Sequence, residues 1–133
     1  MQTIFREIAD FPQSAYMDRR ESARIVLFLD VELQLEQTDR IIKTKSGNVN
    51  MDGSGIMVKS NEEILLGQQL RLKIFLSQEE EPIRCEGDVV HCFEEPLIFK
   101  QHEQIYQIGI SIDKMDFLNL SRLYEFITKE IHS

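Results

Sequence analysis

Three arginines close together are the side chains in this sequence best suited to bind an anion. Arg19, Arg20 and Arg24 form a small cationic group in a chain whose net charge is −8. Arg20 and Arg24 project to the same side of an extended segment and are also neighbours in a helical turn, so their guanidinium groups can converge on one ligand. These groups pair bidentately with phosphate oxygens or with the O6/N7 edge of guanine. The nearby Asp18 and Glu21 favour the alternative of a solvated charged linker.

A polar, glycine-rich turn at residues 50–55 offers further ligand groups. Asn50 and Asp52 can bond to the edge of a base, and Ser54 supplies a hydroxyl. Gly53 and Gly55 permit positive φ and a close approach of a ligand to the backbone. Taken alone, the stretch also fits an ordinary tight turn between two strands. Together with the arginines, it predicts a site for a phosphate-bearing ligand.

Alternation of apolar residues predicts that β-strands position these groups. The longest prediction is a strand over residues 25–36, in which Val26 and Phe28 face outward. A break or bulge is expected at residues 46–48. Further strands are expected at 40–44, 49–51, 56–58, 70–77, 83–93 and 105–113. Hairpin-like connections favour an antiparallel sheet over alternating strands and helices.

The spacing changes to three and four residues near the C-terminus, which predicts an amphipathic helix capped by Asp116 or Asn119. Its expected apolar stripe comprises Phe117, Leu120, Tyr124, Ile127 and Ile131. Residues 4–11 also show helical spacing, with a frayed terminus as the alternative. The economical architecture is a small β-barrel closed by the terminal helix. We therefore expect an N-terminal helix or arm at 1–18 and a single domain at 19–133.

Composition and motif content argue against several classes of function. An acidic chain disfavours sequence-independent binding of a nucleic acid polymer and association with membranes through a polybasic helix. The sequence has no signal-peptide pattern and no membrane-spanning run, which predicts a cytoplasmic protein without membrane insertion. Strand alternation places Cys85 and His91 on one face and Cys92 on the other, which is poor geometry for a metal site. No catalytic motif is evident, so we expect a non-enzyme without metal or cofactor.

Two motifs resemble those of the PilZ domain family. Arg20-x-x-x-Arg24 precedes a long strand, and Asn50-x-Asp52-x-x-Gly55 leads into an apolar strand, as in the family's R-x-x-x-R and [D/N]-x-S-x-x-G motifs. Residues 106–110 and the terminal helix look like the family's closing elements. The resemblance covers residues 19–130. It implies a mainly β fold, a six-stranded antiparallel barrel with a C-terminal helix, and binding of cyclic di-GMP.

The resemblance also assigns roles to individual residues. Arg20 and Arg24 would contact phosphates and guanine, with Arg19 as a secondary phosphate contact. Asn50 would contact a guanine edge, and Gly55 would hold the turn. The ligand would order the arginine arm and so alter the surface offered to a protein partner. A homodimer remains open.

One residue departs from the family motif. Asp52 stands where the pattern has serine; a second register, Asp52-x-Ser54, restores the serine but places Met57 at the glycine position. A carboxylate near a ligand phosphate is repulsive, although it could instead pair with Arg20 or Arg24. The alternative function is therefore a degenerate adaptor that binds only protein. Its partner surface would include the outward-facing Val26 and Phe28.

Overall fold

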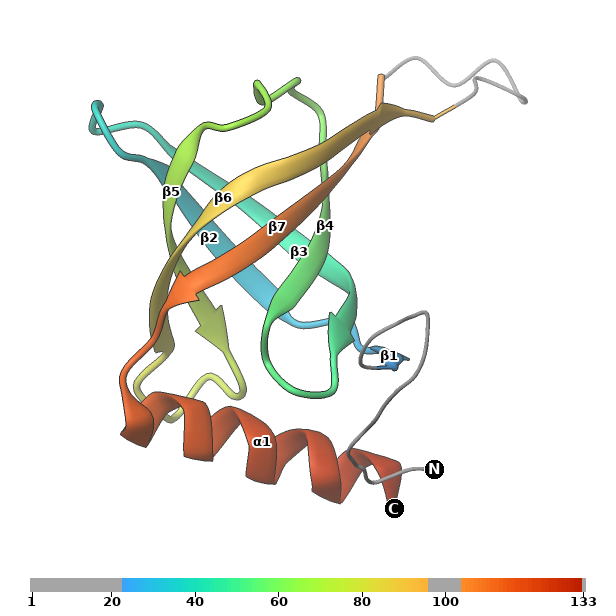
Figure 1. Cartoon of the computed structure of the whole chain (residues 1–133), viewed down its shortest axis with the longest axis vertical. Coiled ribbons are helices and arrows are strands. Elements are labelled where there is room, and N and C mark those ends of the chain that lie inside the picture. Colours follow the sequence, from blue (N-terminus) through green and yellow to red (C-terminus); the bar gives the residue numbers. More distant parts are fainter. Residues whose placement is uncertain (1–22, 96–103, 133) are drawn as a thin grey trace, which may run out of the picture.

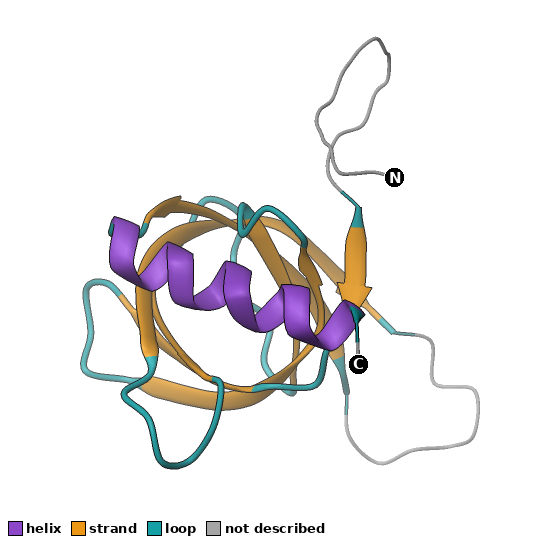
Figure 2. Cartoon of the chain, turned by 90° about the horizontal axis from the view of Figure 1, so that it is seen from below, coloured by secondary structure: helices purple, strands orange, loops and turns teal. Residues whose placement is uncertain are grey.

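Six strands form a closed antiparallel barrel, and one helix lies across its lower end (Figures 1 and 2). The computed structural model describes residues 23–95 and 104–132. The strands are β1 (Arg24–Val26), β2 (Asp30–Leu35), β3 (Ile41–Asn50), β4 (Gly55–Ser60), β5 (Gln69–Phe75), β6 (Ile83–Glu94) and β7 (Tyr106–Lys114), and the helix is α1 (Phe117–Ile131). The sheet order is β1-β3-β2-β5-β6-β7-β4, and pairing of β3 with β4 closes the ring. The predicted six-stranded barrel with a C-terminal helix is confirmed; the predicted arm at 1–18 lies outside the described residues.

The core fills the inside of the barrel with the inward-facing residues of every ring strand. Leu33, Leu72 and Ile108 are fully buried or nearly so. Leu123 and Ile127 of α1 join the same cluster from below. A barrel of this size has an interior just wide enough for its own side chains, so ligands are expected on the outer surface. No helix in the described ranges is long and apolar enough to cross a membrane.

The predicted strand 25–36 is wrong in its middle, because residues 27–29 separate β1 from β2. β2 pairs with residues 41–45 of β3, whereas β1 pairs with residues 48–50. The buried Ser46 lies between these two pairings: its Oγ accepts from Leu29 N at 2.9 Å and donates to Leu27 O. The expected bulge is present, since the β3–β4 register shifts between Ser46 and Asn48. Val26 and Phe28 face outward as predicted, with exposures of 67% and 73%.

The alternation predicted for residues 83–93 fails beyond Val89. The β6–β7 register shifts between Val89 and His91, which turns His91 outward and packs Cys92 partly against the core. Phe93 is exposed and stacks on His91 with ring centroids 5.6 Å apart. A bulge inserts an extra residue, so every side chain after it changes face.

The terminal helix begins where predicted but presents a different stripe to the barrel. Asp116 is the N-cap and accepts from Asn119 N at 2.8 Å. Leu123 and Ile127 are buried, whereas Phe117, Tyr124 and Ile131 are exposed by 82%, 56% and 41%. The predicted apolar stripe is therefore wrong for these three residues. The helix crosses only the mouth of the barrel, so a narrow ridge suffices to seal it.

Candidate functional site

Arg24 and Asn50 lie directly opposite each other where β1 meets the end of β3. Directly opposed residues of antiparallel strands share a face, with Cβ atoms about 5 Å apart. Arg24 is exposed, so its guanidinium group is available to a ligand. Met51 N donates to Ala23 O at 2.9 Å, which holds the start of β1 against the turn. Arg19 and Arg20 lie outside the described residues.

The turn from Asn50 to Gly55 is held by its own polar groups. Gly53 N donates to Asn50 O at 2.9 Å. Asn50 Nδ2 donates to Ser54 Oγ at 3.1 Å, and Ser54 N donates to Asp52 Oδ1 at 2.9 Å. The structure thus brings Arg24 together with all four turn residues predicted for the site.

The side chain of Asp52 is exposed, and its carboxylate also accepts a hydrogen bond within the turn. Its bond to Ser54 N spans two residues, which is the geometry of an Asx-turn. A serine hydroxyl makes the same bond more weakly, so aspartate in place of serine preserves the local backbone. Asp52 would therefore lower the affinity for an anionic ligand through its charge and not through a change in the backbone conformation of the turn.

The two glycines of the turn are required for different reasons. Gly53 has φ +77°, and a Cβ there would lie 2.9 Å from Leu120 Cδ1 of α1. Gly55 lies in β4, where a Cβ would lie 3.2 Å from Ile110 O and 3.4 Å from Asn50 Nδ2. The prediction of positive φ holds for Gly53 and not for Gly55. At Gly55 the close approach of the backbone oxygen of Ile110 on β7 leaves little room for a side chain, with the Asn50 amide next to it.

A row of residues that sequence reasoning missed extends this surface across the barrel. The register aligns Val26, Asn48, Met57, Gly109 and His91 on neighbouring strands, from β1 through β3, β4 and β7 to β6. Because Val26 is two residues from Arg24, the row lies on the same outer face. The lone glycine inside the strand at Gly109 is the one sequence signal that could have indicated it.

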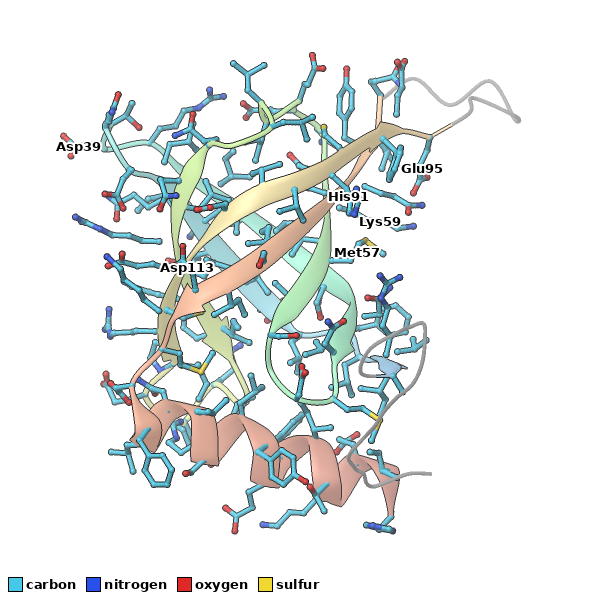
Figure 3. All side chains as sticks on the ribbon, viewed as in Figure 1. Asp39, Met57, Lys59, His91, Glu95 and Asp113 are labelled. Carbon is cyan, nitrogen blue, oxygen red and sulfur yellow. The ribbon has the colours of Figure 1, made fainter. Side chains whose placement is uncertain are left out.

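Met57 and His91 border this surface, as Figure 3 shows. Met57 crosses Gly47, where a Cβ would lie 2.6 Å from its Cε, and His91 lies over Gly109, where a Cβ would lie 3.2 Å from the ring Cδ2. The thioether of Met57 and the imidazole of His91 thus cover the two glycines and form part of the outer surface. This surface offers groups for stacking, and Arg24 offers a charge for an anion.

An ion pair marks the far edge of the surface. Gln107 Nε2 donates to Glu95 Oε2 at 2.9 Å, and Lys59 Nζ lies 3.1 Å from the same oxygen. The amide of Gln107 first, and then the ammonium of Lys59, hold the pKa of Glu95 below its usual range. Glu95 thus stays ionised at neutral pH and forms an ion pair with Lys59. Arg24 is the remaining cation of this surface among the residues described.

No group of three His, Cys, Asp or Glu side chains in the described ranges is arranged to hold a metal ion. The chemistry that the surface offers is hydrogen bonding, charge pairing and stacking. These interactions suit binding of a ligand that remains unchanged.

Comparison with known proteins gives an independent identification. The PilZ domain family model matches residues 18–129. The Bacillus subtilis inhibitor of motility (MotI/DgrA) is similar in structure, with 25% identity and a TM-score of 0.66 over 87% of this chain and 53% of that chain. This chain therefore spans about half the length of that protein. The PilZ domain with c-di-GMP of YcgR from Escherichia coli is also similar, with 10% identity and a TM-score of 0.68 over 86% of this chain and 93% of that chain. No curated protein sequence gave a match.

Proposed function

The chain belongs to the PilZ domain family, and from this premise we propose that it is a receptor for cyclic di-GMP. The observation that carries the proposal is the placement of Arg24 directly opposite Asn50, beside the turn that ends at Gly55. One guanidinium fork and one amide thereby share a face of the sheet. The solved YcgR domain that resembles this chain is described with c-di-GMP.

In this proposal each part of the ligand meets a different chemical group. Arg24 contacts a phosphate and the edge of a guanine, Asn50 bonds to a guanine edge, and Ser54 supplies a hydroxyl. Arg19 and Arg20 join them from the arm that precedes β1. Binding orders that arm, and the ordered arm changes the surface offered to a protein partner.

The turn is also placed to transmit binding to the helix. Gly53 touches Leu120 and Leu123 of α1, where a Cβ would lie 2.9 and 3.6 Å from their δ carbons. A ligand that shifts the turn must therefore shift α1 or strain the contact.

Isothermal titration calorimetry on the full chain tests the receptor function. Arg24→Ala should weaken cyclic di-GMP binding at least about tenfold, because a charge-assisted contact is worth about 1.5–3 kcal/mol. Arg40→Ala is the matched control, since Arg40 lies beyond the other end of β3, about 30 Å along the strand from Asn50, and pairs with Glu62. Absence of binding heat for the wild-type chain well above micromolar ligand would reject the proposal.

The second candidate is an adaptor that binds protein and has lost the nucleotide. The exposed Val26 and Phe28 beside the site, together with the extra charge of Asp52, favour it. Asp52→Ser separates the two functions. A gain of cyclic di-GMP binding that the wild-type chain lacks supports the adaptor, and binding by both supports the receptor.

A further inference from the structure

A charged groove lies away from the turn at residues 50–55, which is the centre of the proposed nucleotide surface. Its volume is about 430 Å³, and it runs over β2, β5 and β6 to the end of β7. The turn joins β3 to β4, and in the ring order β5, at the centre of the groove, is separated from β3 by β2 and from β4 by β6 and β7. Four cations line it, although the chain as a whole is acidic: Arg71, Lys73, Arg84 and Lys114.

Two of these cations face each other across neighbouring strands. Lys73 of β5 is directly opposite Arg84 of β6, and Glu32 of β2 is opposite Lys73 on its other side. Like charges directly opposite one another destabilise a sheet. Glu32 offsets part of this repulsion from the other side of Lys73, and the conflict that remains lies between Lys73 and Arg84.

The cations of the groove are also poorly paired within the chain. Three of these cations form only long ion pairs with carboxylates among the residues that the structure describes. The distances are 3.7 Å for Arg71 Nε–Glu36 Oε2, 3.7 Å for Arg84 Nη2–Glu81 Oε1 and 3.9 Å for Lys114 Nζ–Glu86 Oε1. These distances are too long for hydrogen bonds. By contrast, Lys45 on the adjacent strand pairs with Asp30 at 3.0 Å. In the described part of the chain Lys73 has no ion pair, so the groove keeps donors that a ligand can use.

The mixture of groups in the groove identifies the class of ligand. Glu32, Glu86 and Asp116 lie among the cations, and Ile41 and Met115 add apolar surface. A polyphosphate needs a site of one sign, because interleaved carboxylates repel it. A polypeptide segment carries its carboxylates singly and spaced along the backbone, so it can place one charge at each cation and apolar side chains between them, which the contiguous charges of a polyphosphate cannot do.

We propose that this groove binds an acidic segment of a partner protein, whose carboxylates meet Lys73 and Arg84 and whose apolar side chains rest on Ile41 and Met115. The site is separate from the nucleotide surface and does not depend on the proposed function. A signalling domain would then have one surface for its ligand and another for its partner.

Fluorescence anisotropy with a short fluorescein-labelled peptide of glutamates interspersed with leucines tests the proposal on the full chain. Lys73→Gln and Arg84→Gln should each weaken binding about tenfold, since each removes a charged donor. Tm should change little in either variant, because each relieves the like-charge pair while Lys73→Gln also removes the opposite charge facing Glu32. Added salt should also weaken binding. Lys129→Gln, on an exposed position near the far end of α1, should change binding less than twofold.

The amide resonances that move on titration of the peptide locate the site. Shifts at Lys73 and Arg84, with none at Asn50, support the groove. Equal binding by the Lys73 variant, or equal binding of a peptide with glutamines in place of glutamates, overturns the proposal. Displacement of the peptide by tripolyphosphate at lower concentration than by unlabelled peptide overturns the assigned ligand class.

Discussion

At the scale of single residues, we expect the charge of Asp52 to set how well the turn accepts an anion. Its carboxylate bonds to Ser54 N at 2.9 Å, which a shorter polar side chain could also do. Asp52→Asn keeps the bond and removes the charge, so we expect cyclic di-GMP affinity to rise about tenfold, which corresponds to ~1.4 kcal/mol of relieved repulsion.

Asp52→Ala provides the control for the turn itself. It removes both the charge and the bond, so affinity should rise less while stability falls by about 1 kcal/mol. Titration calorimetry and urea unfolding measure the two effects separately. Equal affinities for the wild type and Asp52→Asn would show that the carboxylate does not face the ligand phosphates.

Cys85 gives a second prediction at this scale. Burial first, and then the charges of Asp113 and Glu86, raise the pKa of its thiol to about 12. The unfolded thiol ionises near pH 8.5. Above that pH the unfolded chain has lost this proton and the folded chain still holds it, so stability falls as pH rises toward about 12, by up to ~1.4 kcal/mol per pH unit.

Urea unfolding at pH 8 and pH 10 measures this slope. Cys85→Val removes the titrating group and should flatten the dependence on pH. The half-buried Cys92 supplies the control, because Cys92→Val should leave the slope unchanged. A slope that survives Cys85→Val would assign the effect to other groups.

At the scale of elements, the glycine turn and α1 behave as one unit. Gly53→Ala meets both a positive φ of 77° and Leu120 Cδ1 at 2.9 Å. Gly67→Ala is a matched control, because φ is 83° there but nothing lies within 4 Å of the added Cβ. We expect Gly67→Ala to cost about 1 kcal/mol and Gly53→Ala to cost more, up to about 3 kcal/mol.

Comparison of the two glycine variants isolates the turn–helix contact. Urea unfolding gives the two stabilities, and the helix resonances report whether α1 moves. Only Gly53→Ala should also weaken cyclic di-GMP binding. Equal effects of the two variants would mean that backbone strain accounts for everything and that α1 yields freely.

Some strands could be predicted from their own sequence, whereas breaks and bulges depend on the neighbouring strands. Strand β5 was predicted well because its buried face runs from end to end, and β7 because residues 106–112 alternate toward the core. The break at 27–29 and the bulge before His91 depend on which strand lies alongside, so no local pattern records them. Arg24 and Asn50 could be predicted as a pair because both belong to motifs of the family. Met57 and His91 could not, because only the order of β4, β7 and β6 in the sheet brings them beside the proposed site.

At the scale of the whole molecule, the barrel depends on α1 to cover its lower end. Leu123 is fully buried in the common core, while Leu118 on the same helix is 72% exposed. Leu123→Ala should lower the free energy of unfolding by about 2–5 kcal/mol, because it removes buried surface and leaves a cavity. Leu118→Ala should change it by less than about 0.5 kcal/mol.

We expect Leu123→Ala to lower ligand affinity as well as stability. Because Leu123 also lies against Gly53, the cavity left by Leu123→Ala frees the turn to move away from the position that presents Asn50. Cyclic di-GMP affinity should therefore fall under conditions in which the variant is still fully folded, as verified by circular dichroism. Unchanged affinity in the folded variant would show that the helix closes the barrel without positioning the site, and communication from ligand to partner would then have to pass through the arm before β1.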